Sequence, residues 1–331
     1  MAFVSLDAPR AGAFQLVATL GPASLDCAPA LAAAGATSFR LNASHLSPAA
    51  AAAAVAQVRQ ALPDAPLVVD LQGAKMRLGV LPERPVRAGD TVRFAAVPGP
   101  GAVPLPHPEL FAAVRPGETL SCDDDRLRFR VRAVAGEELE AVALTDGPLR
   151  PRKGVNVVEH PVELEDLSPS DRGFLDALEG VPGLAFAYSF MQDGAEAAWL
   201  RRRAPGAPVV GKIERAEAVT HLAAIDARVD VVWICRGDLG AQLGMAALGR
   251  LVGGLDPRAL RRPALMAGQV LEHLTTHPEP TRSEVCHLHD LVARGYAGLV
   301  LSDETAIGRD PAAAVARAAE LWQAFRARAG A

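Results

Sequence analysis

Short runs of apolar and β-branched residues recur along the chain, and an amphipathic helical pattern follows most of them. These runs predict strands at Gln15–Leu20, Thr37–Leu41, Leu67–Leu71, Gly183–Tyr188, Pro208–Ile213, Val229–Ile234, Pro263–Ala267 and Gly298–Leu301. Helices are predicted at Pro48–Leu62, Ser168–Leu178, Ala195–Arg202, Glu217–Ile225, Thr281–Ala293 and Pro311–Arg328. This alternation indicates an α/β fold, and we expect a (β/α)8 barrel of the TIM type.

One segment, from about Val80 to Arg152, interrupts the alternation. Proline and glycine punctuate "LPERPVRAGDTVRFAAVPGPGAVPLPHP", and polar and apolar residues then alternate in "RLRFRVRAV" and "EELEAVAL". Alternation with period two between turn residues predicts a small β-rich module. Because it follows the third strand, where active-site loops of barrels lie, we interpret it as a lid. We expect the barrel at 1–79 and 151–331 and the lid at 80–150.

Composition and charge exclude several classes of protein. The net charge of −4 and pI near 6.1 leave no basic footprint for nucleic acid or an anionic membrane. The four cysteines form no CxxC pair, which fits a reducing compartment. The N-terminal "MAFVSLDAPR" has no signal pattern, and no apolar run approaches the roughly 20 residues of a membrane helix. We therefore expect a soluble cytoplasmic protein.

Charged and polar residues stand at the carboxyl ends of the predicted strands, where barrel active sites lie. They are Arg40, Asn42, Ser44 and His45 after the second strand, Asp70, Lys75 and Arg77 after the third, Lys212 and Glu214 at the fifth, "RGDLG" (236–240) at the sixth and "SDETA" (302–306) at the eighth. Lys212 and Glu214 project to the same side because side chains alternate along a strand. A lysine at such a buried end is a functional candidate, although a structural ion pair is the alternative.

The same strand ends predict a metal and anion site. Glu214 and Asp238 come from neighbouring strands, and two hard carboxylates with an otherwise open shell suit Mg²⁺. The "RGDLG" amides at a helix start form an anion cradle, and Arg40 offers a fixed fork for phosphate or carboxylate. Together they indicate a site for an anionic, metal-bound, phosphorylated small molecule.

Other patterns are weaker. "GAPVVGKI" (206–213) has the spacing of a phosphate loop up to its lysine, but its middle reads as a strand and Ile213 stands where Ser or Thr should bind magnesium. His287 and His289 are two residues apart on a predicted helix and point to different faces. "HLTTH" (273–277) lacks a glutamate between its histidines. We interpret all four histidines as positions at polar helix ends.

The motifs together resemble the pyruvate kinase family. They are "LVATLGPAS" (16–24), "FRLNASH" (39–45), "RKGVN" (152–156), "GKIE" (211–214), "RGDLG" (236–240), "PTRSE" (280–284) and "SDETA" (302–306), in that family's order and spacing. The resemblance covers almost the whole chain and implies transfer of phosphoryl from phosphoenolpyruvate to ADP, giving pyruvate and ATP. It stops where the family usually continues into a C-terminal regulatory domain, so we expect a short form without that domain. We also expect a homo-oligomer, with a dimer as one form.

The resemblance implies roles for individual residues. Lys212 would stabilise the transferring phosphoryl group and the enolate oxygen, and Glu214 and Asp238 would hold Mg²⁺ or Mn²⁺. The remaining residues would bind the phosphoryl group (Arg40), the substrate (Arg236, Gly237, Asp238, Gly268, Asn42, Ser44 and Asp70) and the nucleotide (Arg77, Lys153 and His45). Positioning and charge stabilisation would do most of the catalytic work.

The segment "VVDLQGAKMRLG" (68–79) departs from the common family pattern. Typical members bind potassium through Asn, Ser, Asp and a Thr carbonyl; Asn42, Ser44 and Asp70 remain, but Leu71, Gln72 and Lys75 replace Thr, Lys and Glu. This combination resembles the potassium-independent branch. We expect the Lys75 ammonium to act as a catalytic replacement for K⁺, which would not be required. The alternative is an ordinary Asp–Lys surface pair, worth about 0–1 kcal/mol.

Further departures leave the substrate open. Gly268 replaces a threonine that contacts substrate, and "VCHLHDLV" (285–292) replaces a usual Ser-Asp-Val-Ala-Asn pattern. Three alternatives follow: a short, potassium-independent pyruvate kinase; a paralogue acting on another enol phosphate or 2-oxo acid, as a kinase or as an aldolase or lyase through a metal-bound enolate; and a degenerate binding protein. Intact Lys212, Glu214, Asp238 and Arg40 argue against the third.

Overall fold

The computed structural model describes residues 14–97, 99–123, 125–160 and 162–329. The chain divides into two compact units, Met1–Gly73 with Leu167–Ala331 and Ala74–Asp166. The N-terminal "MAFVSLDAPR", for which no signal pattern is predicted, lies outside the described residues. In the described part of the chain, no helix has the length and apolar character needed to span a membrane.

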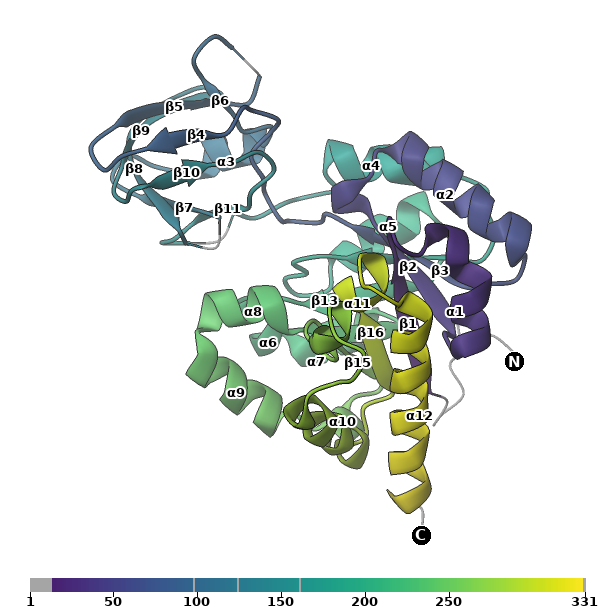
Figure 1. The fold of residues 1–331 in the computed structure, drawn as a ribbon. Coiled ribbons are helices and arrows are strands. Elements are labelled where there is room, and N and C mark those ends of the chain that lie inside the picture. Colours follow the sequence, from purple (N-terminus) through teal and green to yellow (C-terminus); the bar gives the residue numbers. More distant parts are fainter. Residues whose placement is uncertain (1–13, 98, 124, 161, 330–331) are drawn as a thin grey trace. The chain divides into compact units, whose positions relative to one another are not determined.

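The first unit is a closed barrel of eight parallel strands (Figure 1). The strands are β1 (Gln15–Leu20), β2 (Ser38–Asn42), β3 (Leu67–Leu71), β12 (Leu184–Tyr188), β13 (Val209–Ile213), β14 (Val231–Cys235), β15 (Ala264–Ala267) and β16 (Gly298–Leu301). β1 pairs with both β2 and β16, which closes the ring. The predicted α/β barrel is confirmed: three strands have the predicted bounds, and the other five differ by one or two residues.

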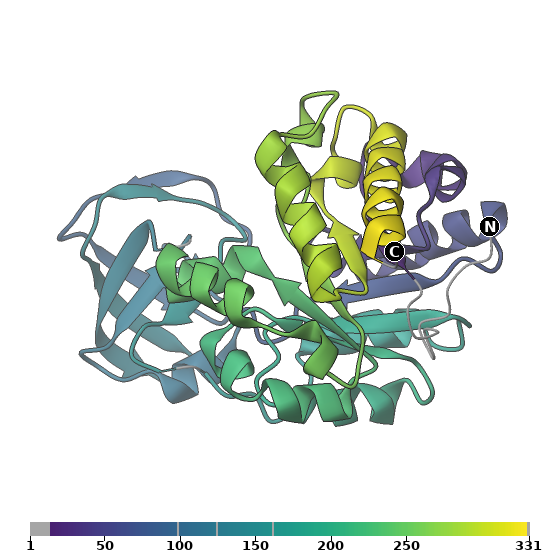
Figure 2. The ribbon, with the colours of Figure 1, turned by 90° about the horizontal axis from the view of Figure 1, so that it is seen from below.

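Helices cover the outside of the barrel. They are α1 (Ala28–Ala34), α2 (Pro48–Ala61), α4 (Pro169–Ala177), α5 (Glu196–Arg203), α6 (Ala216–Thr220), α7 (Leu222–Arg228), α8 (Arg236–Leu243), α9 (Met245–Gly254), α10 (Arg282–Arg294), α11 (Asp303–Ala306) and α12 (Pro311–Ala329). α12 packs beside α1 and α10 (Figure 2). The single helix predicted at Glu217–Ile225 is wrong: α6 and α7 are separate, with the break at His221.

The barrel has an inner and an outer layer of apolar side chains. Val17, Val68, Val210 and Trp233 belong to the inner cluster, whereas alternate strand residues such as Leu16 pack in the outer cluster with the helices. This alternation follows from the two-residue period of a strand. It also fixes which polar residues at the strand ends face inward.

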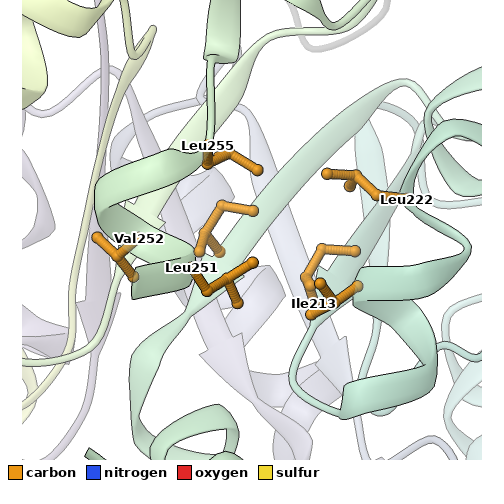
Figure 3. A pocket seen from close by; sticks show the side chains of 7 residues that line it. Ile213, Leu222, Leu251, Val252 and Leu255 are labelled. Atoms are coloured by element: carbon orange, nitrogen blue, oxygen red, sulfur yellow. The ribbon is translucent and has the colours of Figure 1, made fainter. Parts of the chain in front are cut away.

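A small apolar pocket lies in the outer layer, between β13, β14 and the helices α6, α7 and α9 (Figure 3). Its lining is wholly apolar: Ile213, Val219, Leu222, Ile234, Leu251, Val252 and Leu255. Without a polar group, this pocket offers no means of orienting a charged substrate. It is a packing gap beneath α9.

The second unit is rich in β-structure, as predicted. A six-stranded sheet has the order β11 (Val155–Val157), β7 (Thr119–Cys122), β8 (Leu127–Ala135), β9 (Glu138–Ala143), β5 (Thr91–Ala95) and β6 (Val103–Pro104). β10 (Gly147–Leu149) pairs with β4 (Arg84–Val86), and α3 spans Pro108–Ala113. The unit extends beyond the expected 80–150 at both ends, because Arg77 bridges to Gly154 and β11 pairs with β7.

Candidate active site

Polar side chains form the last inward-facing layer at the carboxyl end of the barrel. Along each strand they keep the two-residue spacing from an interior apolar residue: Thr19 follows Val17, Asp70 follows Val68 and Lys212 follows Val210. Ser189 occupies the equivalent place after Ala185 and Ala187 in β12. The register of the parallel strands therefore brings these groups together at one end of the barrel.

Lys212 is the centre of this layer. Its ammonium donates to both oxygens of Asp70, at 2.9 and 3.0 Å, and to the Ser189 hydroxyl at 2.8 Å. It also lies 3.0 Å from Glu214 Oε1, so the predicted proximity of these two side chains is confirmed. Lys212 is only 6% exposed. Burial alone would lower the pKa of Lys212, but the charges of Asp70 and Glu214 outweigh it and raise that pKa.

Asp70 takes its positive partners from the barrel. Besides Lys212, the guanidinium of Arg40 contacts Asp70 Oδ2 through Nε at 2.7 Å and Nη2 at 2.6 Å. Arg40 Nη1 also donates to Thr19 at 3.0 Å. Burial alone would raise the pKa of Asp70, but Lys212 and Arg40 hold it below its usual value. The carboxylate is therefore ionised and locks both cations in place.

Glu214 and Asp238 have different surroundings. Glu214 is buried, and its second oxygen accepts the Phe190 amide at 3.0 Å, where Phe190 has a left-handed φ of 57°. Asp238 is partly exposed in the first turn of α8. Among the described residues no cluster of three or more His, Cys, Asp and Glu side chains could hold a metal. A cation held by these two carboxylates would take its remaining ligands from water or substrate.

The residues after β2 form a compact turn. Asn42 accepts the Ser44 amide at 3.1 Å and begins a short 3-10 helix, Ala43–His45. Asn42 pairs in register with Asp70 across β2 and β3. Asn42 and Ser44 are partly exposed, and His45 is exposed.

The guanidinium of Arg236 contacts backbone carbonyls and a histidine. Its Nε and one terminal nitrogen donate to the Gly268 carbonyl at 2.9 and 2.6 Å, and the same terminal nitrogen donates to the Gln269 carbonyl at 2.7 Å. The other terminal nitrogen lies 2.8 Å from Nε2 of His287. His287 is thus more than a polar position at a helix end, and that interpretation of it was wrong. The backbone of Gly237 remains exposed beside Arg236.

The second unit brings three predicted cationic residues into one neighbourhood. Arg77 bridges to Gly154, and a Cβ placed on Gly154 would lie 3.5 Å from Cε of Lys75. Lys153, next in the chain to Gly154, pairs with Asp123 at 2.9 Å. Asp123 is buried and holds a left-handed φ of 53°. Lys75, Arg77 and Lys153 therefore form one cationic region within this unit.

Two family motifs have roles in folding. Thr281 and Glu284 of "PTRSE" make a reciprocal capping box at the start of α10. Glu304 of "SDETA" is buried and accepts the amides of Leu271 and Ser302, at 3.1 and 2.6 Å. It thereby ties the segments that follow β15 and β16. Burial raises the pKa of Glu304, although those hydrogen bonds act in the opposite direction.

Sequence reasoning missed Ser189, Thr19 and Asp171. The inward spacing from Val17 and Ala187 could have identified Thr19 and Ser189, since each ends a buried strand. Asp171 could not be found this way, because it lies in the first turn of α4. Its fully buried carboxylate accepts the amides of Gln72 and Gly73, both at 3.0 Å. It thus anchors the segment that follows Asp70.

Asp171 predicts a pH-dependent stability. Burial raises its pKa to about 7, although hydrogen bonds from Ser168 and the Gln72 and Gly73 amides oppose the rise. The folded state then keeps a proton that the unfolded chain releases near its ordinary value, so stability falls as pH rises through this window. For Asp171→Asn, we expect the unfolding free energy relative to the parent to rise by about 2 kcal/mol between about pH 5 and about pH 7. Urea unfolding at both pH values measures this change.

Asp226→Asn is the matched control. Asp226 is also buried and accepts two backbone amides, from Arg261 and Arg262, at 2.9 Å each. Its Asn variant therefore loses hydrogen bonds of the same kind. Equal pH dependence of Asp171→Asn and the parent would contradict the prediction.

The backbone around position 73 leaves no room for a side chain, so glycine is required there. It has φ of +60°, and a Cβ there would lie 1.9 Å from the Ser189 carbonyl oxygen. We expect Gly73→Ala to destabilise the fold by about 3 kcal/mol or more, because strain and overlap add. Gly180→Ala separates the two effects: its φ is +74°, but nothing lies within 4 Å of the new carbon. Equal decreases in melting temperature for both variants, measured by thermal unfolding, would contradict a contribution from the steric overlap at position 73.

The fold and site define a (β/α)8-barrel protein with a buried ammonium–carboxylate cluster at the carboxyl ends of its strands and an inserted β-rich unit after the third strand. The family profile "Pyruvate kinase, barrel domain" matches residues 12–315. The chain is 35% identical over 318 residues to a pyruvate kinase of Agrobacterium vitis, covering 90% of this chain. It is 34% identical over 331 residues to pyruvate kinase II of Salmonella typhimurium. The chain belongs to the pyruvate kinase family.

A solved structure agrees with this assignment. The crystal structure of pyruvate kinase from Pyrobaculum aerophilum matches with a TM-score of 0.76 and 26% identity, over 94% of this chain and 73% of that one. The chain spans 66% of the length of the Agrobacterium vitis relative and 68% of the Salmonella typhimurium relative.

Proposed function

We propose that the chain is a pyruvate kinase-like phosphotransferase that moves phosphoryl from phosphoenolpyruvate to ADP, giving pyruvate and ATP. The observation that carries this proposal is the position of Lys212, whose ammonium contacts Asp70, Ser189 and Glu214 at 2.8–3.0 Å within the barrel. A buried, preorganised ammonium can stabilise negative charge that develops on a phosphoryl group or an enolate oxygen without reorganising at that moment. Arg40, fixed by Asp70 and Thr19, adds a second cation for the phosphoryl group.

The charge balance of the cluster supports an additional metal. Lys212 and Arg40 neutralise Asp70 and Glu214, so the four side chains sum to zero. A phosphorylated substrate would therefore need further positive charge. The donor set fits a hard divalent cation, since Glu214 and Asp238 offer carboxylate oxygens with lone pairs to spare. We propose that these two residues hold Mg²⁺ or Mn²⁺, which when bound would neutralise charge on the phosphoryl oxygens.

The other predicted residues complete the proposal. The Gly237 and Asp238 amides, at the start of α8, would bind the substrate carboxylate, with Gly268 beside them and Arg236 holding the loop. Asn42, Ser44 and Asp70 would line the substrate side, and His45, Arg77 and Lys153 would bind nucleotide phosphates. Each of these roles is carried over from the family resemblance.

Lysine usage supports the functional interpretation. The chain has 34 Lys and Arg residues together, and its only lysines are Lys75, Lys153 and Lys212. All three stand at predicted site positions. A lysine ammonium is a compact point charge, whereas the arginine guanidinium spreads its charge over a planar fork. We propose that lysine is kept where a compact cation is needed, with Lys75 supplying the monovalent charge in place of K⁺.

A coupled assay with phosphoenolpyruvate, ADP and Mg²⁺ tests the proposal. We expect turnover, and we expect Glu214→Gln to weaken Mg²⁺-dependent binding of phosphoenolpyruvate, followed by calorimetry, by at least about tenfold. Glu196→Gln is the control, because Glu196 is a buried glutamate whose carboxylate accepts the amides of Gln192 and Gly194. A parent protein that shows neither turnover nor metal-dependent binding would overturn the proposal.

One observation favours a second candidate, in which another enol phosphate or 2-oxo acid is the substrate. A Cβ added to Gly268 would have the Gly237 and Arg236 nitrogens as its nearest neighbours, at 3.5 and 3.7 Å, and no side chain of the described residues lies within 4 Å of it. Such a site admits a larger substituent than one closed by a threonine. Metal-dependent binding of a substituted enol phosphate or 2-oxo acid, without turnover of phosphoenolpyruvate, would identify this function.

A further inference from the structure

The loop after β15 needs a restraint. Gly268 has φ of +79° and Gln269 has φ of +54°, so two successive residues hold the left-handed conformation and one of them is not glycine. A non-glycine residue persists there only when its surroundings hold it. The loop faces the first turn of α8, since the Gly268 Cβ direction points at the Gly237 nitrogen. A shift of this loop would therefore change the proposed anion site.

Arg236 supplies that restraint through its bonds to the Gly268 and Gln269 carbonyls. Its remaining partner is unusual. Within the described part of the chain, no carboxylate lies within ion-pair distance of this guanidinium, which instead contacts Nε2 of His287 at 2.8 Å. His287 comes from α10.

The protonation state of His287 follows from the partner it has. A guanidinium has only N–H donors, so Nε2 must accept and the ring proton must sit on Nδ1. Burial, together with the charge of Arg236, lowers the pKa of His287. The ring is thus neutral in the geometry described. Gaining a proton would remove the acceptor and place two cations in contact.

We propose that His287 is a positioning residue, whose neutral imidazole keeps Arg236 on the Gly268 and Gln269 carbonyls and so holds the loop after β15 against α8. The loop is therefore weakened by acid. The consequence for turnover rests on the proposed function, whereas the consequence for the loop does not.

Other charges surround the pair and set the background of its titration. They are Asp290 and Arg294 on α10, and Glu272, Glu284, Tyr296 and Glu304 around the guanidinium. None of them replaces the ring nitrogen as a hydrogen-bond acceptor for Arg236 among the contacts described. A variant that keeps an acceptor at position 287 at every pH should remove the acid sensitivity.

The test compares the parent with His287→Gln and His289→Gln. Glutamine keeps a neutral acceptor, and His289 is an exposed histidine on the same helix that pairs with Asp290. We expect ¹⁵N-resolved NMR of the parent to show the Nδ1–H tautomer of His287 and a titration below the ordinary range of histidine. We expect kcat/KM to fall less between pH 8 and pH 5.5 in His287→Gln than in the parent and His289→Gln, by a factor below about ten because the pKa of His287 is lowered.

Two results would overturn this inference: a His287 ring that titrates at or above the ordinary value of histidine, or an acid limb of the pH profile that is the same in His287→Gln and the parent. If the parent turns over no phosphoenolpyruvate at any pH, the proposed function fails, but the NMR titration still decides the role of His287. Hydrogen exchange at the Gln269 amide then replaces kcat/KM: relative to the intrinsic exchange rate at each pH, protection is expected to fall in acid for the parent and not for His287→Gln.

Discussion

Replacing Lys212 by Met is expected to lower kcat for phosphoryl transfer from phosphoenolpyruvate to ADP by at least about 10³-fold. The ammonium touches Asp70, Ser189 and Glu214, and no other lysine lies in the barrel unit. Its loss would remove the compact positive charge that contacts both carboxylates. Steady-state rates in the coupled assay, with saturating Mg²⁺, measure this effect.

Lys212→Met also disturbs folding, which the design must separate from catalysis. Removing one partner of a buried charge cluster costs about 3–5 kcal/mol, because Asp70 keeps Arg40 but Glu214 keeps only the Phe190 amide. Lys212→Arg is the matched variant, since it retains the positive charge between the two carboxylates. We expect it to fold with a melting temperature near that of the parent and still to lose most activity, because a planar guanidinium does not replace a point charge. Parent-like kcat/KM in Lys212→Arg would contradict the proposed role.

Ser189→Ala tests how far the hydroxyl shares in this role. The Ser189 oxygen accepts from Lys212 at 2.8 Å and lies 2.7 Å from the Leu71 carbonyl oxygen. Its removal leaves the ammonium with both carboxylates. If Ser189→Ala lowers kcat less than Lys212→Met does, Ser189 is a residue that acts through Lys212.

The barrel could be predicted from the sequence because its strands carry a strong local signal. Val231–Cys235 and Gly298–Leu301 are buried along their whole length, so a continuous apolar run marks them without knowledge of their neighbours. Helices were harder to predict where the signal is short or interrupted. α8 and α9 are divided by Gly244, whose φ of +76° no periodic pattern reveals.

Part of the site was predictable, because side chains alternate along a strand and the position of a residue therefore fixes the side to which its side chain points. Lys212 and Glu214 share one side of a strand end, and their 3.0 Å contact follows from that alternation. The partner of Asp70 was not predictable in the same way. The ring of strands brings Lys212 and Arg40 to Asp70 from 142 and 30 residues away, and no local pattern marks these contacts. His287 was missed for the same reason, since its contact with Arg236 joins residues 51 apart.

The role of Lys75 leads to the second large effect. We expect the parent rate to be the same with and without K⁺, because Lys75 would carry the monovalent charge. Lys75→Glu should reduce kcat/KM by about 10²-fold in the absence of K⁺, and added K⁺ should restore part of it. The change from ammonium to carboxylate alters the local charge by two units, and a bound cation can offset that change. Coupled assays in K⁺ and in tetramethylammonium salts of equal ionic strength measure both effects.

Lys75→Met distinguishes loss of the ammonium from gain of a carboxylate. Methionine matches the length of the side chain but provides neither a positive charge nor an oxygen ligand for K⁺. We therefore expect it to be slow in both salts, whereas Lys75→Glu recovers in K⁺ alone. Strong K⁺ activation of the parent, or a Lys75→Glu variant that behaves like the parent in both salts, would show that Lys75 does not replace the potassium ion.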